Sequence, residues 1–171
     1  METQSSLKIS KLYLISVVLL MLILPIISIV TDHYANYQTP LLVLAGKWFV
    51  FWAIGVRLLT AGLRQVTKPS FTAKEIFHIE SKDAQLIVIE LGFANICFGI
   101  SGILSLFIPE WRSAAAFIGG LYMGIAGVYH VIKKPASPNE VLAMISDLFI
   151  LVVMAIYLYS YFLNNIISHQ P

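Results

Sequence analysis

Long apolar runs separated by short polar segments dominate the chain. Each run is close to the roughly 20 apolar residues that a helix needs to cross a lipid bilayer. The pattern therefore predicts an all-α integral membrane helical bundle with four or five transmembrane helices, in a single domain over residues 1–171. The runs cover residues 12–30, 41–63, 84–107, 114–132 and 141–163.

The first run resembles a secretory signal because Lys8 and Lys11 precede it. It is long for the apolar part of such a signal, however, and no small-residue cleavage motif precedes Thr31. We interpret it as a retained membrane anchor. Pro25 lacks a backbone N–H, so a bend is expected near that residue.

The second run carries Lys47 and Arg57, which makes its crossing the doubtful one. Lys and Arg gather on the cytoplasmic side of membrane proteins. With five crossings and a cytoplasmic N-terminus, the inner segments hold eight Lys and Arg residues and the outer segments hold one, Arg112. Without the second crossing, the same count of inner against outer residues becomes eight against three. The charge bias thus favours five crossings, a cytoplasmic N-terminus and a cytoplasmic connector over residues 64–83. The inner segments then hold Lys8, Lys11, Arg64, Lys68, Lys74, Lys82, Lys133 and Lys134.

Two short motifs predict helix starts. Thr72-Ala-Lys-Glu75 matches a capping box, in which the first side chain and the last cap each other's backbone N–H groups. It predicts a short surface helix in the connector. Ser137-Pro138-Asn139-Glu140 matches the same pattern, with proline at the first helical position, and predicts the start of the last helix.

Composition supports the membrane assignment. The chain is 58% hydrophobic and 12% charged, whereas a soluble domain carries roughly 25% charged residues. A net charge of +2 without a basic cluster excludes a nucleic-acid partner. The single cysteine, Cys97, excludes an intrachain disulfide and is expected to be a small buried packing residue.

Polar residues inside the apolar runs form the candidate site. From the expected cytoplasmic boundary, Arg57, Glu90 and Asp147 lie roughly 9–11 Å deep, and His130 about 3 Å deep, at 1.5 Å per residue. We expect an ion cluster of Arg57 with Glu90, Asp147 or both. In the alternative, each charge acts alone and reaches headgroups or water. A cluster is interpreted as structural before it is interpreted as a proton or ion path.

Glycines mark helix-packing faces. Gly92, Gly99 and Gly102 share one face of residues 84–107 with Asn95. Small residues let helix backbones approach in lipid, where no hydrophobic force drives association. We expect the helices over residues 84–107 and 114–132 to pack on each other, with homodimerisation through the same glycines as the alternative. The corresponding face of residues 114–132 carries Gly120, Gly124 and Gly127.

Catalytic and cofactor motifs are missing from the sequence. There is no nucleophile elbow, no paired histidine motif and no metal-ligand spacing. A bis-histidine haem needs two facing histidines; His130 is placed for this role, whereas His33, His78 and His169 fall in loops or tails. We therefore predict no catalytic residue, no metal and no cofactor.

Residues 62–112 carry a resemblance to known sequences. Glu-Leu-Gly-Phe-Ala-Asn at 90–95, then Gly99, Gly102 and Ser105, resembles an uncharacterised family of small bacterial membrane proteins. Their general shape is similar to that of the DoxX-like helical bundles, which typically have four spans. Gly-Gly-Leu-Tyr-x-Gly-x-Ala-Gly-x-x-His at 119–130 fits the same pattern, and the resemblance covers roughly residues 50–160. It implies importance for Glu90, Asn95 and His130.

Three functional interpretations follow. The first is a non-enzymatic membrane protein that packs against partners or interacts with lipid. The second is a small ion- or proton-coupled transporter that uses Arg57, Glu90 and Asp147. The third is a redox or quinone-binding accessory subunit with its site near His130. The expected partners are the lipid bilayer and either a second copy or a larger membrane complex, and the expected location is the bacterial inner membrane.

Overall fold

The computed structural model describes residues 9–168, with the side chains of 165, 167 and 168 excepted. Lys8 and His169 therefore lie outside the described residues. Within residues 9–168 the chain forms helices and no strand. Five helices are long and apolar enough to cross a membrane, which confirms the all-α membrane class. They run Lys11–Ala35, Leu41–Thr67, Lys82–Leu104, Trp111–Lys133 and Pro138–Asn164.

The first long helix consists of α1 (Lys11–Val18), the π-helical segment η2 (Leu19–Ile23) and α2 (Leu24–Ala35). Pro25 stands at the start of α2. Because proline has no N–H to donate to the preceding turn, a widened π turn just before it lets the helix continue. The structure thus has a π turn next to Pro25, and the bend expected there stays a prediction.

The second long helix consists of α3 (Leu41–Phe49), η3 (Val50–Val56) and α4 (Arg57–Thr67). It is continuous through Lys47 and Arg57 and has the length and hydropathy to cross a membrane. The connector that follows holds the short helices α5 (Pro69–Phe71) and η4 (Thr72–Ile76).

The two predicted capping boxes differ in outcome. The box at Thr72 is wrong, because the connector helix already begins at Pro69 and Thr72 lies inside it. The box at Ser137 starts α8 (Pro138–Ser168), and the Glu140 N–H donates to Ser137 Oγ at 3.2 Å. The Glu140 carboxylate accepts instead from the Ala136 N–H, at 2.8 Å.

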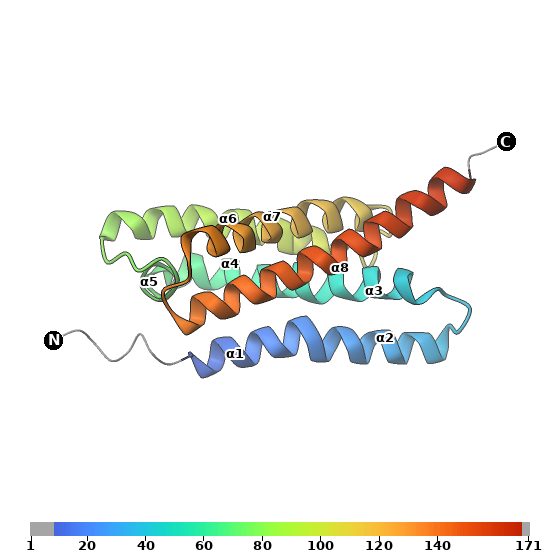
Figure 1. Ribbon diagram of the computed structural model, residues 1–171, viewed down its shortest axis with the longest axis horizontal. Coiled ribbons are helices and arrows are strands. Elements are labelled where there is room, and N and C mark those ends of the chain that lie inside the picture. The colour runs from blue at the N-terminus through green and yellow to red at the C-terminus, as the bar shows by residue number, and fades with distance from the viewer. Residues whose placement is uncertain (1–8, 169–171) are drawn as a thin grey trace.

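The long helices lie side by side along one axis, with α1 and α2 at one flank and α8 crossing the bundle obliquely (Figure 1). α6 (Lys82–Leu104) and α7 (Trp111–Lys133) complete the bundle. The start of α1, the connector and the turn before α8 meet at one end, here called the connector end. The turns after α2 and α6 lie at the opposite, or far, end.

The glycines of α6 bring its backbone against η3 and α4. A Cβ atom built on Gly102 would lie 2.6 Å from the Gly55 backbone nitrogen. One built on Gly92 would lie 3.0 Å from the Gly62 carbonyl oxygen, and Gly99 faces the backbone of Leu59. Backbone atoms cannot move aside, so larger side chains at these positions would force the helices apart.

Three of the α7 glycines face α8 instead, whereas Gly119 lies against Ile54 of η3. Gly120 lies against Met154, Gly124 against Leu151 and Gly127 against Leu148. The prediction that the third and fourth long helices pack on each other through their glycines is therefore wrong. The two glycine faces therefore have different partners. The glycines of α6 allow close backbone contact with η3 and α4, whereas Gly120, Gly124 and Gly127 of α7 accommodate bulky side chains of α8.

Cys97 is exposed rather than buried, so its expected packing role is also wrong. It lies seven residues after Glu90, about two turns along the same face of α6, and Glu90 is exposed too. This face of α6 points away from the bundle.

Candidate functional site

A cavity of about 350 Å³ lies at the connector end. Its walls come from the first long helix, α4, the connector, α6, α7 and α8. Leucines and phenylalanines contribute the apolar part of the walls, including Leu12, Leu20 and Phe77. The polar and charged side chains in the lining are Tyr13, Ser16, Arg57, Thr60, Arg64, Gln65, Thr72, Asn95, Tyr122, His130 and Asp147.

Arg57 and Asp147 form an ion pair in this lining. Arg57 Nη2 lies 3.2 Å from Asp147 Oδ1 and donates to Ser146 Oγ at 3.1 Å. The two charged side chains are 13% and 11% exposed. The expected cluster of Arg57 thus takes the form with Asp147, which α8 brings to the face of α4. Nη1 has a weaker contact, 3.9 Å from the Met123 sulfur.

Asn95 and Gln65 form a second polar pair. Asn95 Nδ2 donates to Gln65 Oε1 at 2.7 Å, and Asn95 is 3% exposed. Its Oδ1 is buried without a hydrogen-bond partner among the described residues. Leaving a buried polar atom unpaired costs roughly 1–3 kcal/mol.

Arg64 lies on the same helix, two turns after Arg57. Its guanidinium stacks on the Phe71 ring, with Cζ 3.7 Å from the ring centroid. Among the described residues, no carboxylate pairs with it. Arg64 therefore adds an unpaired positive charge to the lining.

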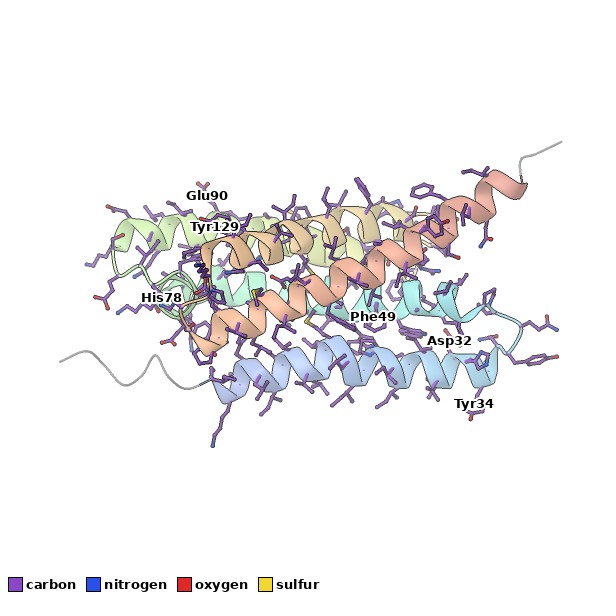
Figure 2. The ribbon with its side chains drawn as sticks, viewed as in Figure 1. Asp32, Tyr34, Phe49, His78, Glu90 and Tyr129 are labelled. Carbon is purple, nitrogen blue, oxygen red and sulfur yellow. The ribbon has the colours of Figure 1, made fainter. Side chains whose placement is uncertain are left out.

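Glu140 joins the cavity to the connector. Its side chain is fully buried, and Oε1 lies 3.0 Å from His130 Nδ1. Oε2 accepts from Ala136 N–H and lies 3.4 Å from His78 Nε2. Figure 2 shows His78 at the connector end. His130 thus lines the cavity and contacts the carboxylate that holds the turn before α8.

Sequence reasoning treated Glu140 as a helix cap and missed its role as the centre of this cluster. The available signal was its spacing from His130, ten residues earlier across a short turn. A capping box predicts where a carboxylate begins a helix, but not which distant side chains surround it.

Glu90 is not part of the cluster. It is exposed and projects outward from α6 (Figure 2). Its depth matches that of Arg57, but its direction does not. Five residues separate Glu90 from Asn95, which places them about 140° apart around the helix. Because Asn95 faces the cavity, Glu90 faces away from it.

A separate polar cluster fastens the far end. Asp32 accepts from Lys47 Nζ at 2.6 Å, from Trp48 Nε1 at 2.9 Å and from Asn36 Nδ2 at 2.8 Å. Figure 2 shows Asp32 on the first long helix beside α3. Lys47, which made the second crossing doubtful, is thus paired with an acid of the neighbouring helix.

These features define a five-helix bundle suited to a membrane, with one polar cavity site at its connector end. No group of three or more His, Cys, Asp or Glu side chains suited to a metal ion occurs in the described part of the chain. The chain belongs to the family of unknown function DUF6790, whose model matches residues 10–164. No curated protein and no solved structure matches the chain. The family match spans all five long helices, so it includes the cavity.

Proposed function

We propose that this protein is a non-enzymatic, lipid-interacting membrane protein that binds a small amphiphile in the connector-end cavity. The observation that carries the proposal is the cavity itself, where the charged Arg64, which has no carboxylate partner among the described residues, lies among apolar walls. Its volume of about 350 Å³ falls within the rough range of 300–1,000 Å³ of small-molecule sites. The protein acts by binding, alone or as an accessory subunit of a larger membrane complex.

The proposed setting is the bacterial inner membrane, with the connector end and the N-terminus in the cytoplasm. Lys11, Arg64, Lys68, Lys133 and Lys134 support this orientation, because they belong to segments that meet at the connector end. The cavity would then open where the cytoplasmic leaflet meets water, which is where an amphiphile has its polar group.

Native mass spectrometry of the protein in nanodiscs tests the proposal. Ala126 lines the cavity, so Ala126→Phe fills part of it. Ile118→Phe, at an exposed position of the same helix, is the matched control. We expect the wild type and Ile118→Phe to retain a stoichiometric small molecule and Ala126→Phe to lose it. Equal small-molecule content in all three proteins would contradict the proposal, and a retained quinone would favour a redox role.

A further inference from the structure

We propose that the bound molecule carries an anionic oxygen group, a carboxylate or a phosphate, and that Arg64 holds this group at the connector side of the cavity. The inference rests on the proposed function, since it assigns chemistry to the same site. The shared chemistry fits an amphiphile with an anionic headgroup or a free anion that enters from water.

The geometry of Arg64 carries the first step. Its guanidinium lies on the face of the Phe71 ring, 3.7 Å from the centroid. This contact holds the guanidinium against the ring, and no side chain among the described residues accepts from its N–H groups. These N–H groups form a rigid fork of donors that matches the two oxygens of a carboxylate or phosphate. Phe71 thus preorganises Arg64 for bidentate recognition.

The charge balance of the lining carries the second step. Arg57 is paired with Asp147 at 3.2 Å, and His130 is paired with Glu140 at 3.0 Å. Arg64 lines the same cavity without a carboxylate partner among the described residues. The lining therefore has one positive charge in excess, and a ligand with one negative charge would neutralise it.

The position along α4 orients the ligand. Arg57 and Arg64 are seven residues apart, which corresponds to about 10 Å along the helix. Arg64 lies near the connector, whereas Arg57 lies deeper. Asn95 lies close to the level of Arg64, because it donates to Gln65, the next residue of α4. The anionic group then sits at Arg64, and the rest of the ligand extends along α4 toward Arg57. Leu12, Leu20 and Phe77 supply apolar contacts for its chain.

Binding measurements on the purified full-length protein test the inference. The probes are oleate, lysophosphatidate with an oleoyl chain, uncharged monooleoylglycerol and inorganic phosphate. Arg64→Gln removes the charge, and Lys68→Gln removes a neighbouring exposed charge outside the cavity lining. Arg64→Lys keeps the charge without the planar fork, and it serves as the second variant if Arg64→Gln does not fold.

We expect the anionic amphiphiles to bind the wild type and Lys68→Gln equally. Arg64→Gln should weaken them roughly ten- to a hundredfold, as expected for a charge-assisted hydrogen bond. Arg64→Lys should fall between. Monooleoylglycerol should bind weakly and be insensitive to all three substitutions. Phosphate that binds as tightly as lysophosphatidate, and depends on Arg64, would support the anion site but identify a free anion as its source.

Two outcomes distinguish a failure of the anion site from a failure of the proposed function. If monooleoylglycerol binds as tightly as oleate and Arg64→Gln changes neither, the anion site is overturned while the amphiphile site stands. If no probe binds and Ala126→Phe retains as much small molecule as the wild type, the proposed function fails as well.

Discussion

Both ends of the bundle place charged side chains between neighbouring helices, but they differ in whether those side chains face a cavity. At the far end Asp32 accepts from three donors, on Lys47, Trp48 and Asn36. At the connector end the Arg57–Asp147 pair faces a cavity. Among the described residues, Arg64 lacks a carboxylate partner there. Buried atoms without a hydrogen-bond partner occur at both ends: Asn95 Oδ1 at the connector end, and His33 Nδ1 and Arg112 Nε at the far end.

This difference distinguishes a structural polar cluster from a binding site. A saturated carboxylate ties two helices together and has little left to offer a ligand. At the connector end, Arg57, Asp147 and Arg64 line a cavity, and ionisable groups inside a membrane mark functional positions. We therefore interpret the Asp32 cluster at the far end as structural and the cavity at the connector end as the binding site.

The largest predicted effect is at the buried ion pair. Arg57→Gln leaves the Asp147 carboxylate buried without its counter-charge, which should lower the free energy of unfolding by about 3 kcal/mol. Unfolding in mixed micelles measures this change. Asp147→Asn in the same protein should restore much of the loss, because it removes the uncompensated charge. A double variant that loses the sum of both single effects would show that the two residues do not act as a pair.

Glu140→Ala should follow closely, with a loss of about 2–3 kcal/mol, since it leaves the Ala136 N–H and the His130 ring without their acceptor. Thermal unfolding in detergent is the measurement, and Glu80→Ala, at an exposed connector position, is the control. Equal stability of the two variants would mean that the Glu140 cluster does not hold the connector end together.

Asp32→Asn should have a smaller effect, about 1 kcal/mol, because the amide keeps an acceptor oxygen and the pair lies near a helix end. Ligand content measured on the same sample tests whether the far end is separate from the binding site. Asp32→Asn should retain the small molecule at the wild-type level. A variant that loses stability slightly but loses the ligand completely would make the far end part of the binding site.

Glu90→Gln should have the smallest effect, within about 0.5 kcal/mol, as is usual for exposed positions. Neither stability nor ligand content should change, because Glu90 faces away from the cavity. A clear loss of ligand in Glu90→Gln, measured by native mass spectrometry, would place Glu90 in the functional layer that its depth first indicated.

The sequence by itself predicted the approximate limits of the long helices and gave their number as four or five, with the charge bias in favour of five. Crossing a bilayer demands a fixed length of apolar chain, so the runs are visible without any knowledge of their neighbours. It also determined the Ser137 cap, since that contact spans three residues. The layer that contains Arg57 and Asp147 follows from counting residues inward from each boundary.

Only the tertiary structure decided which side chains meet within that layer. Helical periodicity gives relative angles along one helix, but not the rotation of that helix in the bundle or the order of its neighbours. Arg57 meets Asp147 from 90 positions away, whereas Glu90 at similar depth faces outward. The partners of the α6 and α7 glycines were undecided for the same reason. Small residues permit close approach by any helix, and the packing of the whole bundle decides which helix contacts each glycine face.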